Sequence, residues 1–281
     1  MKMLDVQGST ITHSHAIQNV GVSGLEYPFT PDLGDGDAFR TSAVWSLGVS
    51  LSAEQRGAHM SRFVETVDTL GDRPISISGM VDFVQNVRQT LEASRASCEV
   101  RFTWFRRVYA PVSRKSALNP HQITWRIDCD ASGGGDGGGD GGDGGGAAQS
   151  RAFVTVQLPV KSLCPCSKAI SERGAHNQRS LVTVTIRSSA DAASLMPSIE
   201  KMVAMVESHA SSPVYPILKR ADEKFVTELA YDNPGFVEDL IRSIAGSLGG
   251  FTGVEAFKLH VRNQESIHAH DCFAEITSPY W

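Results

Sequence analysis

The same order of strand-like and helix-like segments occurs twice in this chain, once before and once after a glycine-rich stretch. In the first half, apolar residues alternate at 45–51 as in a strand, and they recur at helical spacing at 60–67 and 80–91. Strand-like alternation returns at 100–104 and 123–127. We therefore expect strands at the ends of this half, with helices between them.

The second half repeats this order. Strand-like alternation occurs first, at 154–158 and 182–186, and helical spacing follows at 199–206 and 237–244. We expect strands again at 257–261 and 272–276. We expect Asn233 to cap the second of these helices and Pro234 to occupy its first position, because both residue types are favoured there.

Strands at both ends with helices between them predict antiparallel sheets with helices packed on one face, which is an α+β fold. We expect two tandem modules, at 17–130 and 151–281, separated by an insertion at 131–150. The outer strands would leave backbone groups unpaired, and assembly of several copies into a barrel removes such edges. The pattern therefore favours a homo-oligomer.

The insertion has a strongly biased composition. Eleven of the chain's 26 glycines lie between Gly133 and Gly146, interrupted mainly by aspartates. Such a segment is typical of a flexible linker. A calcium-binding repeat is the alternative, but the apolar position that lets such repeats stack is missing.

Charge and composition restrict the class of function. The chain of 281 residues is 41% hydrophobic and 20% charged, with a formal net charge of −5, so it offers no general attraction to nucleic acid or to an anionic membrane. A polyanionic ligand must therefore meet a local basic pocket. No stretch approaches the ~20 apolar residues of a membrane span. The five cysteines are scattered along the chain, which suits reduced thiols and metal ligation in the cytoplasm.

The segment 158–180 lies between two expected strands and is rich in metal-binding residue types. Cys164 and Cys166 flank Pro165, and His176 follows twelve residues after Cys164. A thiolate and an imidazole on one loop can bind zinc or a similar divalent ion, with further ligands from elsewhere. The alternative is that both cysteines are small buried residues and that His176 caps a turn.

A second cluster crowds Lys219, Arg220 and Lys224 around Asp222 and Glu223. It is either a solvated charged turn or a place where a carboxylate completes a metal site while the cations meet phosphate.

A third cluster, 265–271, carries two histidines. Alternation in an extended chain puts His268 and His270 on one face, where they can meet one ligand, although surface histidines are the alternative. Glu238 lies early in a helix, four residues before Arg242, and an exposed ion pair is its simplest explanation.

Several of these segments together resemble one known family. LPVKSLCPCSKAISERGAHNQRS (158–180), LKRADEKFVTELAYDNPGFVED (218–239) and NQESIHAHD (263–271) are similar to type IB GTP cyclohydrolase I. AIQNVGVSGLEYP (16–28) and RGAHMSRFVETV (56–67) resemble the same family's N-terminal motifs. The resemblance covers essentially the whole chain except the glycine insertion.

This resemblance implies a tunnelling fold, with two tandem modules per chain and a homotetramer whose active sites lie at subunit interfaces. It implies hydrolysis of GTP to 7,8-dihydroneopterin triphosphate and formate, at the start of tetrahydrofolate and pterin biosynthesis. The implied ligands of a divalent ion, whether zinc, manganese or iron(II), are Cys164, His176 and Glu223. Glu238 would anchor the guanine ring, and His268 would be a catalytic histidine close to it.

The triphosphate also needs cations, and we nominate Lys168, Arg62, Lys219 and Arg220 for this role. The part played by Cys166 stays open between an alternative metal ligand, a thiol beside the site, and a group that protects Cys164 by reversible oxidation. The part played by His270 also stays open.

Other functions remain as alternatives. A related enzyme of the same family would form a cyclic phosphate of dihydroneopterin, and a non-catalytic protein would only bind a purine. A nitrile reductase of the same fold is disfavoured because no cysteine is placed as its nucleophile. The type IA cyclohydrolase is disfavoured because the chain has no Cys-x-x-His pair.

Overall fold

The computed structural model describes residues 15–34, 38–131 and 150–281. The predicted flexible insertion at 131–150 falls almost wholly on 132–149 and so lies outside the described residues. By mutual contact the chain forms two compact units. The first comprises Met1–Phe102, Thr124–Phe153 and Ser188–Ser194, and the second comprises Thr103–Ile123, Val154–Arg187 and Leu195–Trp281. These units are defined by contacts between residues, whereas the modules expected at 17–130 and 151–281 are defined by the repeated order of strands and helices in the sequence. The module boundaries therefore stay a prediction.

The first unit contains a sheet in which β1 (Ile17–Phe29) pairs with β2 (Thr41–Leu51), and β2 pairs with β3 (Arg95–Tyr109), all antiparallel. Strand β3 belongs to this unit as far as Phe102. The part of β4 (Ser116–Asp130) from Thr124 onward also belongs to this unit, with α1 (Met60–Asp68) and α2 (Ile77–Thr90). The expected strand at 45–51 and both expected helices are present.

Strand β1 was not predicted from periodicity, and its geometry explains why. Its register with β2 shifts twice, which breaks the alternation that a regular strand shows. A Cβ added at Gly21 would lie only 1.9 Å from the carbonyl oxygen of Leu47, so the close approach of the two strands requires glycine here.

Aromatic rings form the centre of the first unit. The ring of Phe29 lies edge-on to Trp45, Phe102 and Trp125, with centroids 5.1, 5.4 and 5.7 Å away. All four side chains are almost fully buried. Edge-to-face packing adds to the hydrophobic stabilisation that their burial supplies.

The second unit contains β5 (Ser150–Leu163) from Val154 onward, β6 (Asn177–Ser189) up to Arg187, β8 (Ala256–Gln264) and β9 (Cys272–Thr277). These strands follow one another in that order, and β6, β8 and β9 pair antiparallel. A short strand, β7 (Ser212–Pro213), also pairs with β5. The antiparallel strands predicted for this half are confirmed.

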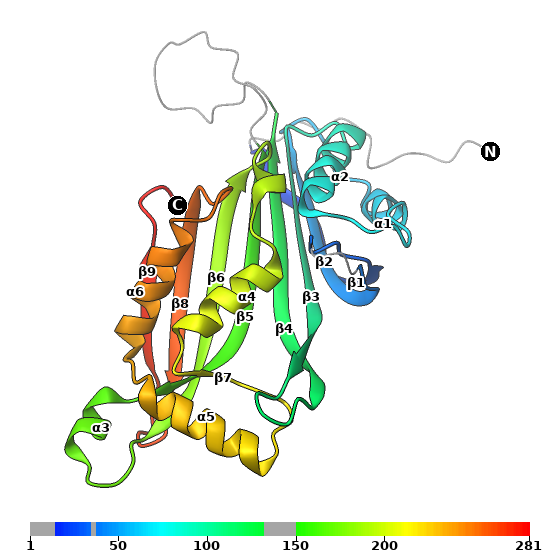
Figure 1. The fold of residues 1–281 in the computed structure, drawn as a ribbon. Helices are drawn as coiled ribbons and strands as arrows, with labels where there is room; N and C mark the ends of the chain where they lie inside the picture. Colours follow the sequence, from blue (N-terminus) through cyan, green and yellow to red (C-terminus); the bar gives the residue numbers. More distant parts are fainter. Residues whose placement is uncertain (1–14, 35–37, 132–149) are drawn as a thin grey trace. The chain divides into compact units, whose positions relative to one another are not determined.

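The helices of this unit are α3 (Pro165–Ile170), α4 (Ile199–His209), α5 (Arg220–Asp232) and α6 (Val237–Leu248). A 3₁₀ turn at Ala193–Leu195 spans the point in the sequence where the chain passes from the first unit to the second. Helices α4 and α6 lie across one face of β5, β6 and β8 (Figure 1). Their apolar residues Met202, Val206 and Ile244 are fully buried. The α+β class with helices on one face of the sheet is confirmed. Within the described part of the chain, every helix is too short or too polar to cross a bilayer.

The predicted start of α6 is wrong. Asn233 ends α5, because its backbone and side-chain N–H groups both donate to the carbonyl of Leu229, at 3.1 and 2.8 Å. A residue before proline avoids the helical region, so the Asn-Pro pair stops one helix rather than starting the next. Helix α6 begins at Val237, and Asp239 Oδ2 accepts the Phe236 N–H at 3.0 Å.

The charged cluster at 218–224 is the first turn of a helix, α5, and not only a turn. Asp222 is fully buried and joins α5 to the loop after β3. Its Oδ1 accepts the N–H groups of Val112 and Ser113 at 2.8 Å each, and its Oδ2 accepts the Ser113 hydroxyl at 2.6 Å and the Lys219 N–H at 2.8 Å. Burial alone would raise the pKa of this carboxyl, but these hydrogen bonds outweigh burial and hold the pKa well below its usual range.

We expect Asp222→Asn to lower the melting temperature by roughly 5 °C or more, because an amide cannot accept four hydrogen bonds in this arrangement. The depressed pKa in the folded state means that Asp222 stabilises the protein above the unfolded carboxyl pKa of ~3.9 and loses this effect as the pH falls below it. The melting temperature of the variant should therefore fall less than that of the wild type between pH 5 and pH 2. Calorimetry over this range checks both expectations, with the exposed Asp232→Asn as the control. An unchanged melting temperature in Asp222→Asn would contradict the first expectation. Equal acid sensitivity of the wild type, Asp222→Asn and Asp232→Asn would contradict the second.

Candidate active site

A cavity of about 520 Å³ lies in the second unit. Four of the residues singled out in the sequence line it, namely Cys164, His176, Glu238 and His268. They come from the end of β5, the start of β6, the first turn of α6 and the loop between β8 and β9. The structure therefore brings together side chains from three separate stretches of the sequence.

Cys164 and His176 are held together by the hydrogen bonds of their loop. The N–H of Cys164 donates to the carbonyl of His176 at 3.1 Å, and the N–H of His176 donates to the Ser167 hydroxyl at 3.2 Å. That hydroxyl donates to the carbonyl of Cys164 at 3.1 Å. These bonds close the loop, so residues twelve apart in sequence line the same cavity.

Cys164 precedes α3, whose first residue is Pro165. The Cys164 Sγ accepts the N–H of Ser167 at 3.4 Å. This contact fixes the orientation of the sulfur, and cysteine sulfur is a common ligand of zinc and similar ions.

Glu238 reaches the cavity because the entry to α6 is attached to the end of β5. The N–H of Gly235 donates to the carbonyl of Leu163 at 3.1 Å, one residue before Cys164. Glu238 is the second residue of the helix and its side chain is exposed towards solvent. A carboxylate is favoured in this first turn by the helix dipole.

His268 and His270 lie in the loop that joins β8 to β9, not in a strand. Their rings nevertheless stack, with centroids 5.0 Å apart and planes 12° from parallel. His268 lines the cavity, whereas His270 is not among the residues that do.

The remaining predicted site residues lie elsewhere. Glu223, Lys219 and Arg220 are exposed at the start of α5, and Arg62 is exposed on α1 of the first unit. Lys168 donates to the carbonyl of Tyr231, with its nitrogen 4.2 Å from the centre of that ring. Among the described residues, no three histidine, cysteine, aspartate or glutamate side chains are close enough to hold a metal ion.

The sequence did not single out several further residues that line the cavity, namely Gln178, Asn263, Glu265, Asp271 and Cys272. Asn263 and Cys272 are direct partners in the β8 to β9 pairing, so only the strand register brings them to one place. Burial, reinforced by the carboxylates of Glu265 and Glu238, raises the pKa of the Cys272 thiol. Cys272 therefore stays protonated at neutral pH and is a weaker metal ligand than a thiolate.

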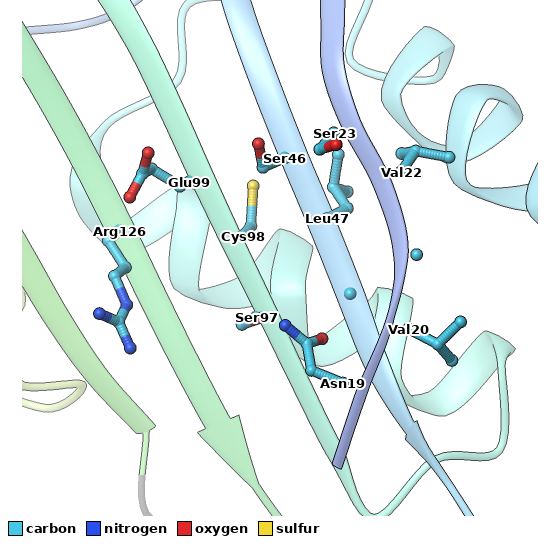
Figure 2. A pocket seen from close by; sticks show the side chains of 12 residues that line it. Asn19, Val20, Val22, Ser23, Ser46, Leu47, Ser97, Cys98, Glu99 and Arg126 are labelled. Carbon is cyan, nitrogen blue, oxygen red and sulfur yellow. The ribbon is translucent and has the colours of Figure 1, made fainter. Parts of the chain in front are cut away.

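A second cavity, of about 320 Å³, lies in the first unit. Figure 2 shows Ser46, Cys98, Glu99 and Arg126 among its lining residues. Arg126 makes two hydrogen bonds to the carboxylate of Asp128, at 3.1 and 2.8 Å, so its charge is already neutralised. No histidine lies among the residues that line this cavity, and it does not suit a triphosphate.

Comparison with known proteins identifies the family of this chain. The model of the family described as type I GTP cyclohydrolase FolE2 matches residues 3–274. The chain belongs to the type I GTP cyclohydrolase FolE2 family. The GTP cyclohydrolase FolE2 of Bordetella petrii is 39% identical over 274 residues, which cover 98% of this chain and 96% of the relative. That of Burkholderia multivorans is 40% identical over 274 residues, covering 98% and 94%. The expected enzyme class and the conversion of GTP to dihydroneopterin triphosphate are thereby confirmed, and the family generally uses a divalent metal.

Solved structures establish the fold class. The uricase of Arthrobacter globiformis aligns with a TM-score of 0.51 at 7% identity, covering 92% of each chain. The urate oxidase of Bacillus sp. TB-90 aligns with a TM-score of 0.52 at 9% identity, covering 93% of this chain and 99% of the other. The predicted tunnelling fold with tandem modules is confirmed, and identities this low carry no further argument about chemistry.

Proposed function

We propose that the cavity lined by Cys164, His176, Glu238 and His268 is the place where this FolE2 enzyme hydrolyses GTP to 7,8-dihydroneopterin triphosphate and formate. The observation that supports this assignment most strongly is the meeting of a thiol, an imidazole and a carboxylate in one cavity. Its volume of about 520 Å³ suits a nucleotide base, since ligand pockets commonly measure ~300–1,000 Å³.

The donor set fits a divalent ion. Cys164 offers sulfur beside an N–H group, and His176 offers an imidazole nitrogen while its Nδ1 lies 3.0 Å from Gln178 Oε1. Sulfur and nitrogen donors of this kind suit zinc, iron(II) or manganese to different degrees. When bound, the ion supplies a water whose pKa is lowered to roughly neutral.

Glu238 and His268 have separate tasks in this proposal. The carboxylate of Glu238 accepts the N1–H and the 2-amino group of guanine, which fixes the base in the cavity. His268 carries a proton to the imidazole-ring nitrogen of guanine as the bond from that nitrogen to C8 breaks. A second water then hydrolyses the other C8–N bond, and C8 leaves as formate. The ribose rearranges and closes onto the freed amine with loss of one water, so the net reaction consumes one water.

The third metal ligand, Glu223, is exposed and outside this cavity. We assign it to the site as the contribution of a second copy of the chain, in a homotetramer with active sites at subunit interfaces. The same assembly would let Lys219, Arg220, Arg62 and Lys168 approach the triphosphate. We also place the enzyme in the cytoplasm, because all five cysteines are free thiols, which suits a reducing compartment.

Subunit mixing tests the shared site. Cys164→Ala and Glu223→Ala should each be inactive alone, because each lacks one ligand. Co-expressed in equal amounts they should regain about a quarter of wild-type activity, since random pairing across an interface restores one site in four. If mixed oligomers stay as inactive as the separate variants, Glu223 does not act from a second copy.

Product analysis tests the reaction itself. The metal-reconstituted protein should release one formate per GTP and yield a pterin that keeps its triphosphate. A cyclic phosphate product would instead identify the related enzyme of the family. A protein that binds GTP but releases no formate would be a purine-binding module, and the proposal would fail.

A further inference from the structure

A row of four buried polar side chains runs from His176 across the sheet of the second unit. The residues are Gln178 and Ser180 on β6, Ser162 on β5 and Asn263 on β8. Each is between 0% and 8% exposed. A buried polar chain is costly unless each member is satisfied, so its hydrogen bonds specify how each group is oriented.

The contacts are continuous. His176 Nδ1 lies 3.0 Å from Gln178 Oε1, and Gln178 Nε2 donates to Ser162 Oγ at 3.1 Å. The hydroxyls of Ser162 and Ser180 are 2.9 Å apart. Ser180 Oγ lies 2.6 Å from Asn263 Oδ1, across a directly paired position of β6 and β8.

Two donors along this row converge on Ser162. The Ser180 hydroxyl is the donor in its contacts with both Asn263 Oδ1, which can only accept, and Ser162 Oγ. Ser162 Oγ accepts from the amide nitrogen of Gln178 on its other side.

The orientation of the Gln178 side-chain amide determines which role Nδ1 of His176 plays. With its nitrogen directed at Ser162, Gln178 presents only its carbonyl oxygen to His176. That oxygen accepts, so Nδ1 of His176 is the donor in this contact, and in the neutral ring the lone pair lies on Nε2. We propose that Gln178 is a positioning residue that selects this tautomer of His176 and so prepares Nε2 as the metal donor.

This inference rests on the proposed function in one respect, the assignment of His176 as a metal ligand. Partners of this kind orient the ring and raise its basicity, and their loss typically weakens metal binding by ~10–100-fold. Gln178→Leu should therefore weaken Zn²⁺ binding to the metal-free protein by about this factor. Gln178→Glu keeps an acceptor beside Nδ1 and should bind Zn²⁺ at least as tightly as the wild type.

A matched control is available on the neighbouring strand. Gln157 on β5 donates from its amide nitrogen to Thr183 Oγ1 at 3.1 Å, with no histidine in that contact. Gln157→Leu should leave Zn²⁺ affinity unchanged in the same competition titration. The inference would be overturned if Gln157→Leu weakened Zn²⁺ binding as much as Gln178→Leu does, or if Gln178→Glu weakened it equally. Either result would show a general effect of these substitutions on the sheet.

The tautomer can be read without any metal. In metal-free protein labelled with ¹⁵N at histidine, His176 should show protonated Nδ1 and unprotonated Nε2, assigned by comparison with His176→Asn. In Gln178→Leu the signals should move towards the Nε2–H form. A wild-type His176 that is already protonated at Nε2 would overturn the proposal, whereas a lack of formate release would contradict only the proposed function.

Discussion

Replacing Cys164 by alanine should abolish both metal binding and formate release while leaving the fold intact. Activity should fall at least about 10³-fold, because without the ion no water of lowered pKa is available at neutral pH. Bound divalent metal should drop from one ion per site to none. Metal analysis and a formate assay on the reconstituted variant measure the two effects, and circular dichroism checks the fold.

Cys129→Ala provides the control for this experiment. Cys129 is also a thiol, but it is 1% exposed in the core of the first unit, on β4. Its loss should cost some stability and no metal. If Cys164→Ala keeps its metal and a turnover rate near that of the wild type, the ion is held elsewhere.

Replacing Glu238 by glutamine should reduce kcat/KM for GTP by up to about 10⁴-fold. The amide would place an N–H₂ group where guanine also donates, and both donors would lose a partner. The same change should reduce the preference for GTP over inosine triphosphate, which lacks the 2-amino group. Steady-state kinetics with both nucleotides measures the loss and the preference together.

Glu228→Gln is the matched control, because Glu228 is exposed on α5 and forms an ion pair with Lys224, at 2.8 Å. It should leave both nucleotides' kinetics as in the wild type. A Glu238→Gln variant that kept its preference for GTP would show that another group reads the guanine edge.

Much of the fold could be predicted because burial on one face leaves a periodic trace. The alternation at 182–186 and 257–261 matches β6 and β8, which pair directly, and the helical spacing at 237–244 matches α6. Strand β1 left no such trace, because Gly21 and the register shifts interrupt it. Helix α5 was not predicted because its first turn is rich in charged residues, as surface turns also are.

From residue spacing alone, only the part of the site that one loop holds could be predicted. Cys164 and His176 are joined by hydrogen bonds within a short loop, so their spacing alone suggested a meeting. Gln178, Asn263 and Cys272 meet through the pairing of β6, β8 and β9, and sequence periodicity does not set that register. Glu223 was nominated from the family resemblance, and it is exposed at the start of α5, outside the cavity that Cys164 and His176 line.

Anomalous diffraction from crystals of the metal-loaded protein, grown with 8-oxo-GTP, tests the central assignment most directly, because this nucleotide already carries oxygen at C8. We predict one metal peak per site, bonded to Cys164 Sγ and His176 Nε2, with the guanine edge of the nucleotide on the Glu238 carboxylate. A metal peak away from Cys164 and His176, or a base bound outside this cavity, would contradict the assignment.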